Sequence, residues 1–116
     1  MDGMDVPDGS ESEASSKVSV PEEADFLYAY STVPGYLSWR NTTKGSWFIQ
    51  SLTKVFGEKA EHMDILRMLT LVNARVSTYK SCTGLKGSHD KRQVPSFVSR
   101  LLKDLYFFPE KVTEQN

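Results

Sequence analysis

The side chains with the clearest potential for chemistry lie in a short segment of this chain, between Trp39 and Trp47. Its nine residues include two tryptophans, Arg40 and Asn41, and Gly45 precedes an apolar helical run. Arginine offers five donors in a rigid fork that matches a carboxylate two bonds at a time, and tryptophan supplies stiff apolar contact area. The segment suits a surface that binds a carboxylate beside an apolar wall. A loop whose tryptophans cap the core, with Arg40 in water, fits the pattern equally.

A second candidate pair is Cys82 with His89, seven residues later. A nucleophilic thiol needs a positioned base and an oxyanion hole, and a loop flanked by glycines predicts neither. A metal site needs four suitable ligands, which this part of the chain does not offer. We therefore expect an exposed cysteine, no metal site and no cofactor.

The composition predicts one small folded domain with an acidic arm. The chain has 116 residues, of which 39% are hydrophobic and 25% charged, as in globular proteins. Residues 1–25 carry eight acidic side chains and one basic, whereas residues 26–116 carry seven acidic and thirteen basic. We therefore predict a flexible acidic arm over residues 1–22, a domain over 23–110 and a tail over 111–116.

The same composition argues against several classes of partner. The basic residues are scattered, and Lys91-Arg92 is the only adjacent pair, so no nucleic-acid partner is expected. A single cysteine fits a reducing compartment. No apolar run approaches the length of a membrane span, and no signal-peptide pattern opens the chain. These features favour a cytoplasmic protein without a membrane partner.

The hydrophobic pattern predicts an α/β fold with two strands and two helices. Residues 25–32 are aromatic and nearly continuously apolar, which indicates a strand covered on both faces. One helix is expected from an N-cap at Ser46 to Gly57, and another over about 62–79, with His62 at its start. Residues 80–94 are polar and predict an exposed loop. So few strands cannot close a sheet, which suggests that neighbouring strands come from another chain.

The last element has two interpretations. Residues 98–106 carry apolar side chains at helical spacing, and periodicity alone favours a helix. Pro95, Phe97-Val98 and the aromatic run of residues 106–108 favour a strand instead. The residues alone leave this choice open.

Several motifs resemble the small subunit of an executioner caspase. They are Glu23 to Thr32 (EADFLYAYST), Pro34-Gly35-Tyr36, Ser38-Trp39-Arg40-Asn41 and Gly45 to Leu52 (GSWFIQSL), with Val94-Pro95, Val98-Ser99 and Leu105-Tyr106-Phe107 near the end. The resemblance implies half of a caspase-type α/β/α sandwich in an aspartate-specific cysteine endopeptidase acting in apoptosis. It also implies that a large subunit supplies the catalytic cysteine and histidine, since no matching signature occurs here. Two such pairs would join through their small subunits.

The resemblance further implies roles for residues of the Trp39 segment. Arg40 matches the residue that binds the substrate aspartate, and Ser38 and Arg40 match residues that hydrogen-bond to the substrate backbone. Trp39 and Trp47 match aromatic walls of the second and fourth subsites. Asn41 matches the side chain that favours an acidic residue at the fourth position.

Other implied features concern the second subsite and the dimer. Leu37 stands where tyrosine is usual, and Ser88 stands where a loop aromatic is expected, so the second subsite should be wider. Residues 96–102 should form a strand that pairs with a second copy of the small subunit, with Val98 near the two-fold axis. An alternative to the enzyme is a non-catalytic caspase fragment that pairs with intact caspases as a decoy or scaffold.

Overall fold

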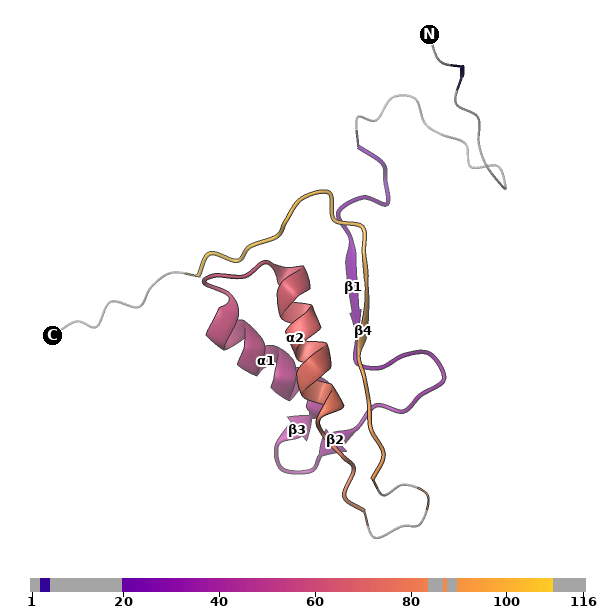
Figure 1. Cartoon of the computed structure of the whole chain (residues 1–116), viewed down its shortest axis with the longest axis vertical. Helices are drawn as coiled ribbons and strands as arrows, with labels where there is room; N and C mark the ends of the chain where they lie inside the picture. The colour runs from indigo at the N-terminus through magenta and orange to yellow at the C-terminus, as the bar shows by residue number, and fades with distance from the viewer. Residues whose placement is uncertain (1–2, 5–19, 84–86, 88–89, 110–116) are drawn as a thin grey trace, which may run out of the picture.

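The computed structural model describes residues 3–4, 20–83, 87 and 90–109, which form two helices and four short strands (Figure 1). In chain order the elements are β1 (Leu27–Tyr30), β2 (Arg40–Asn41), β3 (Gly45–Ser46), α1 (Trp47–Lys59), α2 (Ile65–Ser77) and β4 (Ser96–Ser99). The predicted α/β class is confirmed, and a small hairpin, β2–β3, is added to it. The predicted tail lies outside the described residues, as does most of the predicted arm.

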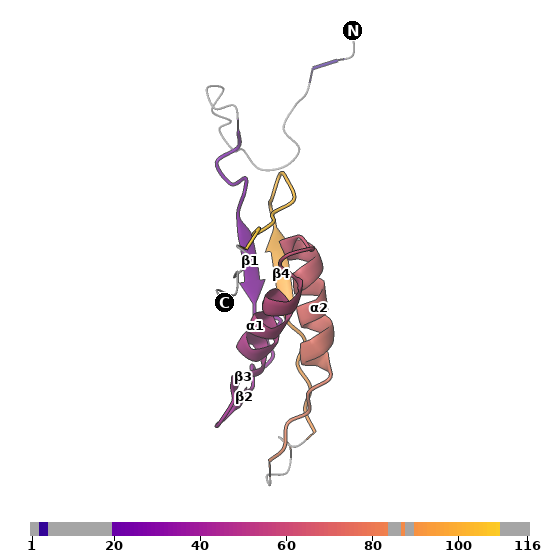
Figure 2. The ribbon, with the colours of Figure 1, turned by 90° about the vertical axis from the view of Figure 1, so that its left-hand side faces the viewer.

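Strands β1 and β4 form an antiparallel sheet that the two helices cover on one face (Figures 1 and 2). Leu27 and Phe97 contact the helical core from this sheet. Within the described residues the strand is covered on one face, and the expected cover of its second face stays a prediction. Phe26 and Tyr30 on the other side are each about half exposed, at 50% and 51%.

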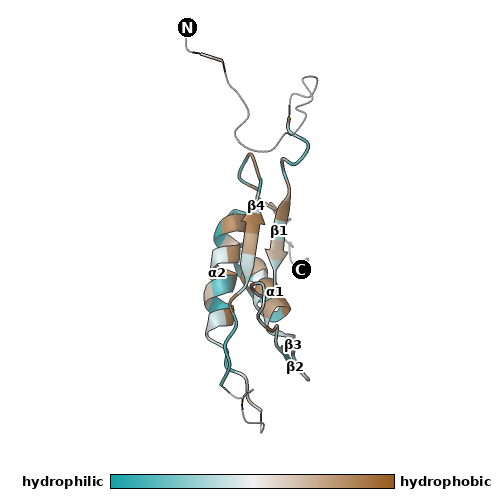
Figure 3. Cartoon of the chain, turned by 90° about the vertical axis from the view of Figure 1, so that its right-hand side faces the viewer, coloured by the Kyte–Doolittle hydropathy of each residue, from teal (hydrophilic) through white to brown (hydrophobic). Residues whose placement is uncertain are grey.

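The open face of the sheet carries a row of stacked aromatic rings. In Figure 3 both β1 and β4 include residues in the brown of hydrophobic positions. The ring centroids of Phe26 and Tyr28 are 6.1 Å apart, and those of Tyr28 and Tyr30 are 6.5 Å apart. The guanidinium of Arg100 lies over the Tyr28 ring, 5.4 Å from its centroid. Val98 lies opposite Tyr28 in the register and is 48% exposed. Within the described ranges, no helix covers this apolar face.

Helix α1 begins where the sequence predicts and ends later. The Ser46 side chain accepts a hydrogen bond from the Ile49 amide at 3.0 Å, which confirms the predicted N-cap. The predicted end at Gly57 is wrong, because the helix continues to Lys59. Gly57 is not left-handed, so it does not act as the terminating glycine.

Helix α2 is shorter than the predicted 62–79. The buried carboxylate of Asp64 accepts a hydrogen bond from the Leu66 amide at 3.2 Å and starts the helix there. His62 therefore lies in the turn before the helix, and its predicted position at the helix start is wrong. Within the described residues, neither helix is long and apolar enough to cross a membrane.

The last element is a strand, so the helical periodicity of residues 98–106 is misleading. Residues 96–99 pair with β1, from Ser96 opposite Tyr30 to Ser99 opposite Leu27. A strand is confirmed at residues 96–99, shorter than the 96–102 that the resemblance implies, and its pairing with a second copy stays a prediction. A short isolated helix is only marginally stable, whereas pairing with β1 gives these residues backbone hydrogen bonds. Tertiary structure therefore overrides the local pattern.

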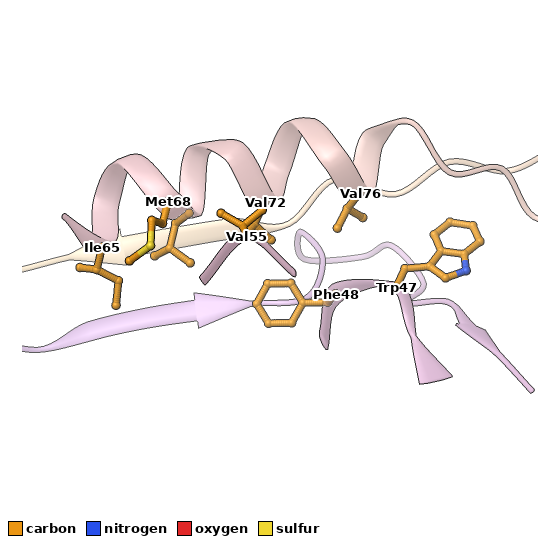
Figure 4. Packing of buried hydrophobic residues seen from close by; sticks show 8 residues of the cluster. Trp47, Phe48, Val55, Ile65, Met68, Val72 and Val76 are labelled. Atoms are coloured by element: carbon orange, nitrogen blue, oxygen red, sulfur yellow. The ribbon is translucent and has the colours of Figure 1, made fainter. Parts of the chain in front are cut away.

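The core lies between the two helices and the sheet. Figure 4 shows a row of α2 side chains, with Phe48 and Val55 of α1 below it and Trp47 near its Val76 end. The buried apolar residues are Trp47, Phe48, Val55, Ile65, Met68, Leu69, Val72 and Val76. Burying them against one another holds α1, and therefore Trp47 at its first turn, in a fixed place.

Candidate functional site

The hairpin β2–β3 holds Arg40 next to the start of α1. Arg40 pairs with Ser46, and Asn41 pairs with Gly45 across a three-residue turn. Gly45 has a φ of +95°, a backbone conformation that other residues adopt only with strain, so glycine suits this corner. Ser46 both closes the hairpin and caps α1. The helix therefore begins directly beside Arg40 and brings Trp47 to the same place.

The Asn41 side chain shapes the turn of this hairpin. Its Oδ1 accepts hydrogen bonds from the backbone amides of Thr43 and Lys44, both at 2.9 Å. An asparagine that bonds to its own turn in this way stabilises the turn. No hydrogen bond joins its Nδ2 to another described residue. Within the described residues, the Asn41 Oδ1 is thus occupied and both Nδ2 hydrogens remain available, which suits an anionic ligand.

Three aromatic rings form a continuous stack beside the hairpin. The Trp39 and Trp47 centroids are 5.9 Å apart with an interplanar angle of 21°, and Tyr79 lies 5.6 Å from Trp47 on a tilted plane. Trp47 is only 7% exposed, whereas Trp39 is partly exposed. Trp47 thus anchors the stack in the core, and Trp39 presents an apolar face outward.

Trp39 and Trp47 help to line a cavity of about 290 Å³ whose lining includes positively charged side chains. It is lined by Trp39, Arg40, Asn41, Thr42, Trp47, Lys80, Ser81, Cys82 and Thr83. The lining holds two cations, Arg40 and Lys80, and no carboxylate. Arg40 is exposed and forms no ion pair within the described part of the chain. An unpaired guanidinium beside an indole wall can bind a carboxylate through charge-assisted hydrogen bonds.

The far wall of the cavity comes from the loop after α2, which a single buried serine anchors. The Ser81 amide donates to the Lys91 carbonyl at 2.8 Å, the Asp90 amide donates to the Ser81 carbonyl at 2.9 Å, and the Lys91 amide donates to the Ser81 Oγ at 2.7 Å. This bonding holds Lys80 and Cys82 on either side of Ser81 against the cavity. The sequence indicated an exposed polar loop here, and nothing in its pattern pointed to Lys80 as part of the site.

Cys82 is a free and exposed cysteine, which confirms the interpretation made from the sequence. His89 lies outside the described residues. No cluster of three His, Cys, Asp or Glu side chains that could hold a metal ion occurs in the part of the chain described.

Of the six predicted substrate-binding residues, the structure brings four together around the cavity and leaves two outside it. Trp39, Arg40, Asn41 and Trp47 line it. Leu37 does not line the cavity and is 73% exposed. Ser38, the residue before Trp39, does not line it either. The prediction of a wider second subsite also depends on Ser88, which lies outside the described residues. Val98 lies apart from the cavity, on the open face of the β1–β4 sheet.

One residue that the sequence did not single out contacts the backbone of a site residue. Gln93 is 4% exposed, and its Oε1 accepts a hydrogen bond from the Trp39 amide at 2.7 Å. In a sequence, a lone glutamine in a polar loop gives no signal for such a contact. Only the chain path that returns residue 93 to residue 39 reveals it.

Comparison with known proteins agrees with this geometry. A family model for the caspase domain matches residues 1–106. Caspase-7 of Gallus gallus is 48% identical over 101 residues, covering 86% of this chain and 33% of the relative. Caspase-3 of Oryctolagus cuniculus is 51% identical over 90 residues, covering 77% and 32%, and caspase-3 of Felis catus is 45% identical over 107 residues, covering 91% and 38%.

The chain thus spans about a third of the length of these relatives. The family match nevertheless extends over most of the chain and includes all the residues that line the cavity. The chain therefore belongs to the caspase-domain family.

Proposed function

We propose that this chain is the small-subunit part of an executioner-type caspase, an endopeptidase that cleaves after aspartate with a catalytic cysteine. The observation that carries the proposal is the exposed Arg40 guanidinium, which has no ion pair in the described residues and lines a cavity beside Trp39 and Trp47. In the assembled enzyme this chain supplies the substrate groove, and a large subunit supplies the catalytic cysteine and histidine.

The charges of the cavity favour an acidic peptide. Arg40 binds the aspartate that precedes the cleaved bond, because its planar fork forms two charge-assisted hydrogen bonds with one carboxylate. Lys80 and the free Nδ2 donors of Asn41 favour a second acidic residue at the fourth position, where Trp47 provides the wall. Ser38 and Arg40 bind the backbone of the extended peptide, and Leu37 borders a second subsite wider than a tyrosine would leave.

Pairing with a large subunit is supported by the open aromatic face of the sheet. Phe26 and Tyr30 are half exposed there, although burying such rings is strongly favourable. Both outer edges of the β1–β4 sheet lack a strand partner within the described ranges. The apolar face can be covered by a large subunit. The two free edges can pair with strands of the large subunit at one edge and of a second small subunit at the other.

The proposal is tested by assembling the chain with a caspase large subunit and measuring peptide cleavage. We expect cleavage after aspartate, and we expect an aspartyl electrophile to label only the large subunit. Cys82→Ser is expected to leave kcat/KM unchanged, because the exposed Cys82 thiol has no base positioned beside it among the described residues. Mass spectrometry of the labelled subunits is the readout. Label on Cys82 would contradict the assignment, and assembly without cleavage would favour the non-catalytic decoy.

A second test addresses the two-fold interface. In the assembled enzyme with Cys82→Ser, we expect Val98→Cys to form a disulfide between two small subunits on mild oxidation. Val98 lies on β4 and is 48% exposed, and a disulfide needs Cβ atoms about 4 Å apart, as an antiparallel pair near a two-fold axis provides. Non-reducing electrophoresis measures the linked dimer.

The matched control for this test is Val94→Cys in the same background. Val94 is also exposed, at 45%, and lies four residues earlier. In an antiparallel pair centred on Val98, the two copies of Val94 are about 27 Å apart at roughly 3.4 Å per residue, so they cannot be bridged. Equal cross-linking of both variants, or of neither, would contradict an axis near Val98.

A further inference from the structure

Gln93 is a buried polar side chain that joins three segments distant in the sequence. It lies three residues before β4 and is 4% exposed. A buried amide is costly unless its donors and acceptor are all bonded. Its partners lie 54 to 62 residues earlier in the chain. The Gln93 contacts are therefore tertiary, and they bear directly on the cavity.

The amide of Gln93 uses both its donor and its acceptor functions. Its Oε1 accepts from the Trp39 backbone amide at 2.7 Å. Its Nε2 donates to the Ser31 carbonyl and lies 3.4 Å from the Ser38 Oγ. Glutamate has the same shape but no donor, and it would bring an anionic oxygen against the Ser31 carbonyl. Only an amide of this length satisfies all three partners.

The contact with Trp39 fixes the backbone immediately before Arg40. On one side the Trp39 amide donates to Gln93, and on the other the Trp39 carbonyl accepts from the Trp47 amide at 3.1 Å. Arg40 then pairs with Ser46 in the hairpin. The backbone leading into Arg40 is thus held between a buried side chain and the first turn of α1.

We propose that Gln93 is a positioning residue that sets the register and orientation of Arg40 for the substrate carboxylate. The inference rests on the function proposed above. A bidentate contact is sensitive to small displacements, because both hydrogen bonds must be aligned at once. Gln93 contacts no substrate in this scheme. It acts through Trp39, whose backbone it holds, and a loosened Trp39 allows the guanidinium to move away from the carboxylate.

The test compares Gln93→Glu with wild type in the assembled enzyme. We expect kcat/KM for an aspartyl peptide to fall on the order of a hundredfold, the effect of displacing a reactive geometry by about 1 Å. We also expect the preference for aspartate over glutamate at the cleaved position to fall about tenfold, since a misplaced fork discriminates less well. Partial unfolding lowers both rates equally and leaves this ratio unchanged.

Two further variants separate positioning from stability. Ser96→Ala removes a hydrogen bond of 3.0 Å to the Thr32 carbonyl from the same part of the fold, without touching Trp39, and should leave the ratio unchanged. Gln93→Met keeps the length and burial of the side chain but removes its polar atoms. It replaces Gln93→Glu in the test if that variant does not assemble. Hydrogen exchange should then accelerate at the Trp39 amide more than at the Trp47 amide.

The possible failures point to different conclusions. If wild type cleaves aspartyl peptides and both Gln93 variants keep its ratio of aspartate to glutamate cleavage, the positioning role is refuted and the proposed function stands. If the wild-type assembly cleaves no aspartyl peptide, the proposed function fails. In that case, unchanged exchange at Trp39 in Gln93→Met would also exclude Gln93 as the residue that holds this backbone.

Discussion

Arg40→Lys is expected to lower kcat/KM for aspartyl peptides on the order of a thousandfold in the assembled enzyme. Lysine keeps the positive charge but replaces a planar fork with a single ammonium group, which cannot form two parallel hydrogen bonds with one carboxylate. Arg40 has no ion pair in the described residues, so its removal leaves no buried charge unpaired. The loss therefore reports substrate binding rather than damage to the fold.

Steady-state kinetics with a fluorogenic aspartyl peptide measures this effect. The matched control is Arg75→Lys, the same chemical change on an exposed arginine of α2 that does not line the cavity. It is expected to retain wild-type activity. Cleavage by Arg40→Lys at a rate near that of wild type would show that Arg40 does not bind the substrate aspartate.

Trp47→Ala is expected to lower the free energy of unfolding by about 3–5 kcal/mol. Trp47 is 7% exposed, and its ring contacts both Trp39 and Tyr79, so truncation leaves a cavity and ends two aromatic contacts. The part of the cavity wall that Trp47 forms is lost with it. The preference for an acidic residue at the fourth substrate position should therefore weaken in the same variant.

Urea unfolding of the assembled enzyme, followed by tryptophan fluorescence and circular dichroism, measures the loss of stability. Trp47→Phe is the control, because a phenyl ring preserves part of the stack between Trp39 and Tyr79. It should lose less than half as much stability as Trp47→Ala. Equal losses in the two variants would contradict this account, because they would show that a phenyl ring restores neither the packing nor the stacking.

The sequence pointed to four residues that line the cavity because they are close together in the chain. Trp39, Arg40, Asn41 and Trp47 fall within one hairpin and the first turn of a helix, so local structure brings them together. The Ser46 cap was also predictable, since a serine before an apolar helical stripe is a local signal. The motifs of this segment carried the resemblance, of which the family match confirms the caspase domain.

Other features depended on contacts that no local pattern reveals. Lys80 reaches the cavity because Ser81 bonds to residues 90 and 91, and Gln93 reaches Trp39 across 54 residues. The strand at Ser96–Ser99 exists because it pairs with β1, although its apolar spacing favours a helix. The helix ends were misjudged for a different reason. Asp64 starts α2 through a local hydrogen bond from the Leu66 amide, and Gly57 stays helical although a glycine at this place predicted a stop.

The sequence by itself determined the class of the fold and which residue types stand beside Arg40, since both follow from residue types and short-range spacing. The tertiary structure decided how that arginine is held and what else lines its cavity. The physical reason is that hydrogen bonds and packing between distant segments depend on the path of the chain, and the path depends on burial of the whole core. The buried Gln93 side chain can bond to its distant partners only once that core has formed.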